Sequence, residues 1–226
     1  MTSIPYYNRT IDYAITLPRK RGMNMNILVL GGNGFVGQEV LTLALEKGYQ
    51  VSYLSRHPGE GELFTNPAVT YIQGDLLAAD SIRLNQNYDW IIDLVGSITP
   101  KTLDALNVQA RKGTVALANT NHVPNILYLS ANVGYPSYVK TKRAGEAIIQ
   151  KSGLNYIILR SGLIYGPGRP SSLSTAILVK FAIKIPLIGK AFSSIAPTPV
   201  ANVAEQILTA IEQETRNLVK NIEIRS

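Results

Sequence analysis

The chain has 226 residues, of which 46% are apolar and 16% are charged, and it contains no cysteine. This composition excludes a mainly disordered protein, a disulfide-stapled scaffold and a thiolate metal site, and we predict no metal centre. The formal charge is +7, but residues 1–22 contribute +3 of it through four basic residues and one acidic residue. The remaining charge is too dilute to predict nucleic-acid binding.

The first 22 residues are basic and lack the apolar core of a secretory signal, and Pro5 and Pro18 interrupt any long helix there. We expect a disordered tail, or an upstream extension with Met23 or Met25 as the working start. The alternative is a mitochondrial transit peptide. No stretch reaches the roughly 18 apolar residues that a membrane-spanning helix needs. We therefore expect a soluble protein of the cytoplasm, or of mitochondria in a eukaryote.

From residue 26 onward, short β-rich runs alternate with longer amphipathic stretches. The predicted strands are Asn26–Leu30, Val51–Ser55, Val69–Gln73, Trp90–Val95, Ile126–Ser130 and Tyr156–Arg160. The predicted helices are Val36–Lys47, Thr102–Ala118, Tyr138–Lys151 and Asn202–Glu212, with Gly48 and Gly153 as helix stops. These near-continuous apolar strands predict an α/β fold with a doubly wound parallel sheet and helices on both faces. We expect a single domain over residues 23–226, with a small C-terminal lid at about 169–198.

A glycine-rich loop joins the first predicted strand to the first helix. Residues 31–37 read GGNGFVG and satisfy the pattern G-x-G-x-x-G. Glycines allow the tight turn, the approach of a pyrophosphate to the backbone and the packing of helix on strand, while the helix N-terminus attracts the anion. The alternative is a flexible glycine turn. The strand-turn-helix setting favours a dinucleotide site of the Rossmann type, with contacts from Gly31, Asn33, Gly34, Phe35, Val36 and Gly37.

The end of the second strand bears on the choice between NAD and NADP. It reads Leu54-Ser55-Arg56-His57 and lacks the carboxylate that usually binds the adenosine ribose of NAD. Arg56 could pair with the 2′-phosphate of NADP through its planar guanidinium. The alternative for Arg56 is a solvated loop arginine, and His57 is expected on the loop surface. The sequence therefore favours NADP, with NAD as the alternative.

Further motifs follow in order along the chain, and with the glycine loop they carry a resemblance to a known superfamily. These motifs are Gly74–Leu76, Asp89–Gly96, Asn107-Val108, Gly113-Thr114, Tyr138-x-x-x-Lys142 with Gly145-Glu146, Arg160–Gly168 and Pro199–Ala204. Over about residues 26–225 the chain resembles the short-chain dehydrogenase/reductase superfamily in its extended or atypical branch, which includes epimerase- and dehydratase-like proteins. Its glycine loop, its link at 128–136 and its helix at 138–146 look similar to the NAD(P)H-binding accessory subunit of respiratory complex I and to an accessory protein of ubiquinone biosynthesis.

The resemblance implies roles for several residues. Asp75 would face the adenine ring, Leu76 would also contact the cofactor, and Gly96 would line the cofactor cleft. Tyr138 would exchange a proton with the substrate, Lys142 would bind the nicotinamide ribose, and Asn107 matches the asparagine of the fourth helix. Tyr138 and Lys142 are four residues apart, so they share a helical face, and an ammonium there would lower the pKa of the tyrosine. The alternatives are an exposed Lys142–Glu146 salt bridge and, for Asn107, a polar helix residue without a catalytic role.

One departure from the superfamily pattern concerns the fifth strand. The strand usually ends in paired small hydroxyl residues, of which the second orients the substrate carbonyl, whereas here Ser130 is followed by Ala131. Ser130 is the candidate catalytic hydroxyl, but it lies one place early, and side chains alternate between the faces of a strand. Asn132 is a candidate replacement donor.

The segment 172–192 intersperses apolar residues with three lysines. It is expected to form a lid helix packed on the domain. The alternatives are an apolar lid over a lipophilic substrate and a basic amphipathic surface in peripheral contact with a membrane.

We predict an NAD(P)-binding protein of the short-chain dehydrogenase/reductase type that transfers hydride to or from a small or lipophilic carbonyl substrate. A non-catalytic NAD(P)H-binding accessory or assembly protein is the first alternative, favoured by Ala131. A nucleotide-sugar epimerase or dehydratase is the second, disfavoured because only about thirty residues separate Gly168 from Pro199. The sequence does not define an oligomeric state.

Overall fold

The computed structural model describes residues 25–167, 197–213 and 216–223. The tail at 1–22, the segment at 172–192 and all but the last two residues of the lid at 169–198 lie outside these ranges.

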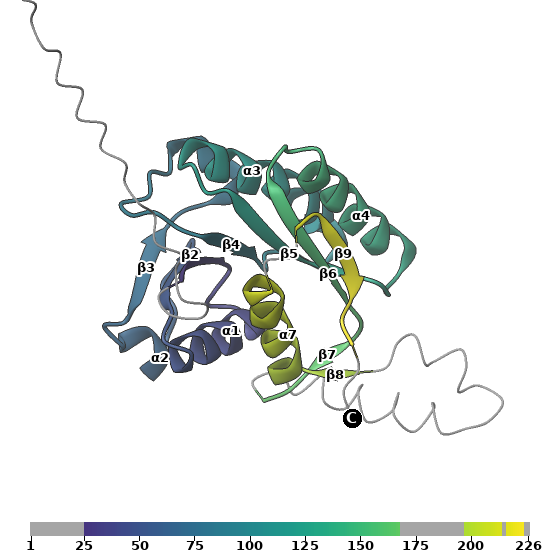
Figure 1. Cartoon of the computed structure of the whole chain (residues 1–226). Helices are drawn as coiled ribbons and strands as arrows, with labels where there is room; N and C mark the ends of the chain where they lie inside the picture. Colours follow the sequence, from purple (N-terminus) through teal and green to yellow (C-terminus); the bar gives the residue numbers. More distant parts are fainter. Residues whose placement is uncertain (1–24, 168–196, 214–215, 224–226) are drawn as a thin grey trace, which may run out of the picture.

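A seven-stranded parallel sheet forms the middle layer of the molecule (Figure 1). Its strand order is β3-β2-β1-β4-β5-β6-β9. The strands β1, β2 and β3 follow one another toward one edge of the sheet. The chain then returns to the middle, where β4 lies beside β1, and β5, β6 and β9 follow toward the other edge. Sheets of this kind bind ligands at the carboxyl ends of the strands where the order reverses, here between β1 and β4. The strands are β1 (Asn26–Leu30), β2 (Gln50–Ser55), β3 (Val69–Gln73), β4 (Trp90–Asp93), β5 (Asn125–Ala131), β6 (Asn155–Ser161) and β9 (Leu218–Asn221).

Helices cover both faces of the sheet, with α1 and α7 on one face and α3 and α4 on the other (Figure 1). The α-helices are α1 (Phe35–Glu46), α2 (Glu62–Thr65), α3 (Ala110–Thr120), α4 (Pro136–Gln150) and α7 (Val200–Glu212). Short 3₁₀ turns lie at Leu76–Ser81 and Pro100–Thr102, and a π-helical turn at Ala105–Gln109 leads into α3. Two further strands, β7 (Ile164–Tyr165) and β8 (Thr198–Pro199), form a separate parallel pair.

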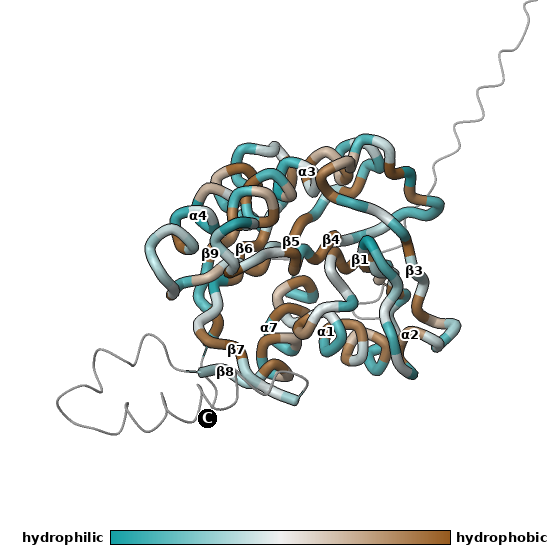
Figure 2. The backbone as a smooth tube through the Cα atoms, turned by 180° about the vertical axis from the view of Figure 1, so that it is seen from behind, coloured by the Kyte–Doolittle hydropathy of each residue, from teal (hydrophilic) through white to brown (hydrophobic). Residues whose placement is uncertain are grey.

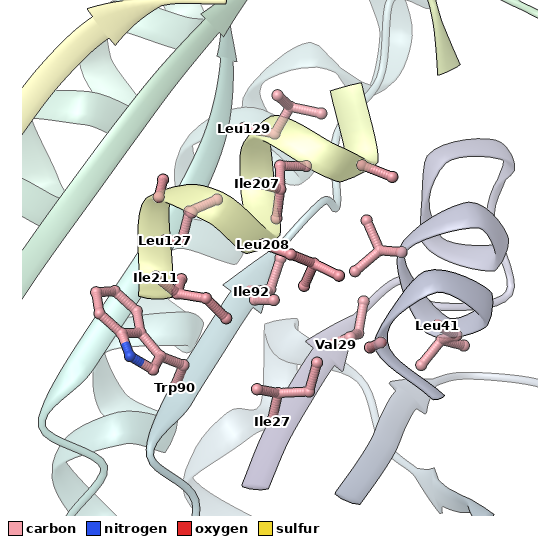
Figure 3. Close-up of a cluster of buried hydrophobic side chains, with 14 of the residues drawn as sticks. Ile27, Val29, Leu41, Trp90, Ile92, Leu127, Leu129, Ile207, Leu208 and Ile211 are labelled. Carbon is pink, nitrogen blue, oxygen red and sulfur yellow. The ribbon is translucent and has the colours of Figure 1, made fainter. Parts of the chain in front are cut away.

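Two apolar clusters, one on each side of the sheet, hold the three layers together. Figure 2 shows that the strands in the middle of the molecule consist largely of hydrophobic residues. On the side of α1 and α7, helix α7 presents Ile207, Leu208 and Ile211 to the sheet, where they lie near Ile92 and Leu127 (Figure 3). Because alternate strand residues point to opposite faces, covering both faces requires the almost entirely apolar strands seen in the sequence.

The fold confirms the predicted doubly wound sheet, and all six predicted strands are present. The predicted ends of α1, α4 and α7 lie within two residues of the observed ones. Gly48 and Gly153 follow α1 and α4 with φ values of 78° and 79°, a left-handed conformation that glycine adopts at little cost. Within the described part of the chain, no helix has the length and hydropathy needed to cross a membrane.

The observed secondary structure differs from the prediction in two places. The predicted helix Thr102–Ala118 is interrupted by the π-helical turn, so regular α-helix begins only at Ala110. The edge strand β9 was not expected, since its four residues are too few to show a pattern. It is held by contacts distant in sequence: the amide of Gln206 on α7 donates to the carbonyl of Glu223 and accepts from its N–H, at 2.8 and 2.7 Å.

Candidate functional site

The glycine-rich loop forms a tight cradle between β1 and α1. Gly31 has φ 76°, and a Cβ atom on Gly37 would lie 2.5 Å from the Gly31 carbonyl oxygen, so loop and helix could not pack with a side chain there. Gly34 is exposed at the N-cap of α1, and no side chain caps this end of the helix. Phe35 and Val36 lie in the first turn that follows. The loop thus presents a helix N-terminus that suits an anion such as a pyrophosphate.

A cleft of about 280 Å³ opens beside this loop at the carboxyl ends of the strands. It is the place where the strand order reverses, as expected for a doubly wound sheet. Seven of the predicted cofactor residues line this cleft: Gly31, Asn33, Gly34, Arg56, Asp75, Leu76 and Gly96.

Loop contacts fix the β2 end of the cleft. The Asn33 side-chain amide donates to the carbonyl oxygen of His57 at 3.1 Å, so the glycine loop is tied to the segment that follows β2. Arg56 and His57 are exposed, and both line the cleft. Asp75, which follows the neighbouring strand β3 and also lines the cleft, caps the turn Leu76–Ser81 by accepting from the N–H of Leu77 at 3.0 Å. The cleft wall at the end of β2 therefore carries a cation and no carboxylate.

Lys142 lies beneath the cleft rather than on the surface. It is 5% exposed, its Nζ donates to the Leu129 carbonyl at 2.9 Å, and it sits 4.6 Å from the centre of the Tyr128 ring. A Cβ atom added to Gly96 would lie 3.2 Å from Nζ, which places the ammonium directly under the floor of the cleft. The alternative of an exposed Lys142–Glu146 salt bridge is wrong, because Lys142 is buried.

Burial strongly perturbs the charge of Lys142. Loss of solvent lowers its pKa to about 7, and the nearby positive charge of Arg111 adds to this effect, while Asp93 and Glu146 oppose it. The ammonium and the neutral amine are therefore both populated near neutral pH. A base in a buried cleft with such a pKa is typical of functional sites.

A buried ion pair that sequence reasoning missed supports the same floor. Asp93 on β4 and Arg111 on α3 are both inaccessible to solvent, with Oδ2 and Nε 2.9 Å apart. Arg111 also donates to the Val95 carbonyl at 2.6 Å, and Asp93 accepts from the Val95 N–H at 3.1 Å. Burial raises the pKa of Asp93, and the charge of Arg111 counteracts that rise. An aspartate inside an apolar strand was the available signal, since a buried charge needs a partner.

Asn107 connects the loop after β4 to helix α4. It is fully buried in the π-helical turn, where its amide donates to the Ser97 carbonyl at 2.8 Å and to the Thr141 hydroxyl at 3.1 Å, and accepts from the Ser97 N–H at 3.0 Å. Gly145 permits the close contact with α4, because a Cβ there would lie 2.5 Å from the Asn107 carbonyl oxygen. Asn107 thus positions the helix that carries Lys142.

Tyr138 lies one turn before Lys142 on α4 and is half-buried. Its ring is 5.8 Å from that of Tyr135, at the N-terminal end of the same helix. The helix therefore places a phenol at the surface of the site and an amine below its floor, on one face.

The Ser130 hydroxyl, which was predicted to take part in catalysis, is bonded to Glu146 instead of facing the cleft. Ser130 is 1% exposed, and its hydroxyl donates to Glu146 Oε1 at 2.5 Å. Glu146 also pairs with Arg160 on β6, whose NH2 lies 2.6 Å from Oε2, and with Arg143. These contacts lower the pKa of Glu146 despite its burial. Ser130 therefore belongs to a network that fixes α4 on β5 and β6.

The neighbouring position offers no hydroxyl. Ala131 is buried at the end of β5, and Asn132, the candidate replacement donor, is half-buried with its backbone N–H donating to the Ser161 carbonyl at 2.9 Å. Its side-chain Oδ1 is buried without a hydrogen-bond partner. Of the four predicted catalytic residues, Asn107 and Lys142 lie next to Gly96 at the cleft. Tyr138 lies one turn before Lys142 on α4, and Ser130 is bonded to Glu146.

The sequence profile of a family described as NAD(P)H-binding matches residues 31–214. Among curated relatives, the "Ceramide reductase" of Caulobacter vibrioides is 24% identical over 206 residues, which make up 88% of this chain and 65% of that protein. The "Photosystem II assembly factor Ycf39" of Trieres chinensis is 29% identical over 150 residues, 62% of this chain and 46% of that one. The match thus spans less than two thirds of either relative's length.

Among solved structures, the fold is similar to that of the UDP-glucose 4-epimerase of Thermus thermophilus in complex with NAD. The TM-score is 0.66 at 17% sequence identity, and the match covers 88% of this chain and 77% of that one. At this identity the likeness establishes the shared fold.

Proposed function

Because the chain belongs to the NAD(P)H-binding family of the atypical short-chain dehydrogenase/reductases, we propose that it is an NADP(H)-dependent oxidoreductase acting on a small or lipophilic carbonyl compound. The observation that carries this proposal is the placement of Tyr138 and Lys142 one turn apart on α4, with Lys142 Nζ directly beneath Gly96, which lines the cleft built on the glycine loop. The name of the bacterial relative, a reductase of a lipid, supports both the reductive direction and a lipophilic substrate.

The residues of the cleft fit a dinucleotide. The uncapped N-terminus of α1 and the backbone of Gly34 suit the pyrophosphate, and Arg56 suits a 2′-phosphate. Asp75 and Leu76 would contact the adenine end, and Lys142 the nicotinamide ribose. A bound reduced nicotinamide supplies the hydride that a carbonyl carbon accepts.

The remaining chemistry belongs to the chain's own residues. Tyr138 donates its phenolic proton to the carbonyl oxygen while the carbonyl carbon is reduced, and a proton from solvent restores the phenol afterwards. The Lys142 ammonium stabilises the transient phenolate, because a nearby cation favours the anionic form. Asn107 holds α4 and the loop after β4 in place.

A non-catalytic accessory or assembly protein is the second candidate. It is favoured by Ala131 and by the engagement of Ser130 with Glu146, which together leave the end of β5 without a hydroxyl to orient a carbonyl. A relative named as an assembly factor is consistent with it.

Single-turnover oxidation of NADPH separates the two candidates. The protein is mixed with NADPH and a panel of aldehydes, ketones and quinones, and loss of the reduced cofactor is followed by absorbance. We expect oxidation that depends on both protein and carbonyl compound for at least one member. NADPH that binds but is never oxidised across the panel would favour the accessory role.

Substitution of Arg56 tests the choice of cofactor. NADPH is expected to bind more tightly than NADH, and Arg56→Ala should reduce this preference by about tenfold, since one charge-assisted contact to the 2′-phosphate is lost. Calorimetric titration of both cofactors measures the ratio. The control is Arg83→Ala, at an exposed arginine that does not line the cleft. Equal or tighter binding of NADH by the unmodified protein would contradict the prediction.

The pKa of Lys142 predicts pH-dependent cofactor binding. Below about pH 7 Lys142 is a charged ammonium that attracts the anionic cofactor from beneath the cleft floor, and above that pH it is a neutral amine. The affinity for the cofactor should therefore fall severalfold from pH 6 to pH 8.5. NADH is the suitable probe, because it lacks the 2′-phosphate, whose second pKa of about 6 would titrate in the same range. The measurements use a His57→Gln background, which removes the imidazole that lines the cleft. Lys142→Met should abolish the dependence, and an unaltered pH profile in that variant would exclude Lys142 as its source.

A further inference from the structure

One of the most exposed apolar side chains among the described residues, that of Tyr135, lies beside Tyr138. Among the described residues, three large hydrophobic side chains are well exposed: Leu77 at 52%, Ile98 at 55% and Tyr135 at 39%. Single exposed apolar residues are ordinary on protein surfaces. Two of these three, however, are joined to each other, because the Tyr135 hydroxyl donates to the Ile98 carbonyl.

The loop that carries Ile98 turns its polar groups inward. The Ser97 hydroxyl lies 2.7 Å from that of Thr102 and accepts from the Thr99 N–H at 2.9 Å. The backbone N–H and carbonyl of Ser97 are both bonded to Asn107. This internal bonding holds the loop in one conformation and leaves Ile98 as its exposed apolar side chain.

Tyr135 is packed against the proposed proton donor. The rings of Tyr135 and Tyr138 are 5.8 Å apart with 38° between their planes. Gly134 has φ 145° and lies against the other ring, since a Cβ there would be 2.4 Å from Cδ1 of Tyr138. If the Tyr138 hydroxyl binds a substrate carbonyl, a ring attached to that carbonyl can therefore contact the Tyr135 ring.

We propose that Tyr135 and Ile98 form the substrate-selecting surface of this site and favour carbonyl compounds whose carbonyl is attached to a flat aromatic ring. The inference rests on the proposed function for the role of Tyr138. An aromatic ring can pack on the face or edge of Tyr135 while covering the aliphatic Ile98. In the reaction, the carbonyl carbon gains the hydride of the reduced nicotinamide and the oxygen gains the Tyr138 proton, giving a benzylic alcohol.

Binding of a non-reducible analogue tests the surface without requiring turnover. The probe is 2-naphthamide, titrated by ligand-observed NMR into protein loaded with NADP⁺. Ile98→Ser and Tyr135→Ser should each weaken its binding by roughly threefold to tenfold, the range expected for loss of one apolar or aromatic contact. Tyr135→Phe keeps the ring and should retain most of the affinity. Leu77→Ser is the matched control, an exposed apolar residue outside the cofactor cleft, and should bind the probe like the unmodified protein.

Calorimetry of NADP⁺ and thermal unfolding check that each variant keeps its cofactor site and fold. Unchanged naphthamide affinity in both serine variants would overturn the inference, as would tighter binding of an alkyl amide of equal carbon number. A loss confined to Ile98→Ser and Tyr135→Ser would support it. If the probe binds in this pattern but no aryl ketone is ever reduced, the surface stands and the proposed catalysis fails. If carbonyl compounds are reduced but the probe does not bind in this pattern, the proposed catalysis is supported and the inference about Tyr135 and Ile98 is wrong.

Discussion

Tyr138→Phe is expected to lower kcat/KM for carbonyl reduction by at least about a hundredfold, because it removes the proton that the carbonyl oxygen must gain. Affinity for NADPH should change little, since the phenol is not a main anchor of the dinucleotide. The ring itself remains, so its packing against Gly134 and Tyr135 is kept. Single-turnover oxidation of bound NADPH by a reactive aryl ketone compares the two proteins directly.

The matched control for this experiment is Tyr156→Phe, at the opposite end of β6 from the site. It should leave the rate within about twofold of the unmodified protein, within the small range typical of substitutions away from a site. Equal rates for Tyr138→Phe and the unmodified protein would refute the role of Tyr138. Absence of turnover in both, across a broad panel, would favour the accessory-protein candidate.

Gly34→Val is expected to abolish measurable dinucleotide binding, with a loss of at least about a hundredfold in affinity. Gly34 is exposed at the start of α1, where the pyrophosphate must approach the backbone closely. A Cβ there would approach only the Gly31 carbonyl oxygen, at 3.1 Å, and the backbone φ of −80° suits any residue. The fold should therefore survive, and calorimetry of NADPH together with thermal unfolding would show binding lost without unfolding.

Gly37 provides the contrast within the same motif. A Cβ at this buried position would lie 2.5 Å from the Gly31 carbonyl oxygen and 2.6 Å from Gly32 Cα. Gly37→Ala should therefore destabilise the protein as well as impair binding, because backbone atoms cannot move aside cheaply. Normal dinucleotide affinity in Gly34→Val would show that the site lies elsewhere.

Lys142 on α4 lies in a cluster of buried charged side chains. Lys142, Asp93 and Arg111 come from three different elements and meet next to Tyr128, whose ring lies 4.6 Å from the Lys142 ammonium and 4.8 Å from the Arg111 guanidinium. Burial is the largest cause of the low Lys142 pKa, and the charge of Arg111 adds to it, while Asp93 and Glu146 oppose it. The Asp93–Arg111 pair also holds Val95, next to Gly96 on the cleft floor.

The sequence by itself determined the features that depend on neighbouring residues. The GGNGFVG loop requires glycine for reasons of local backbone geometry, and its position between an apolar strand and a helix defined the cofactor cleft. Continuous apolar strands required coverage on both faces and so predicted the parallel sheet. Gly48 and Gly153 set helix ends, and the spacing of Tyr138 and Lys142 put them on one face of α4.

Only the tertiary structure decided which partner each polar side chain found. Lys142 appeared able to pair with Glu146 one turn away, yet it is buried beneath Gly96, while Glu146 binds Ser130 and Arg160. Strand β9 pairs with β6, and Gln206 on α7 binds Glu223 just after it. Asn107 in the π-helical turn binds Ser97 and Thr141. These outcomes depend on contacts between segments that are distant in sequence. Burying a charge is costly unless the folded chain supplies a partner, and local spacing does not reveal which partner that is.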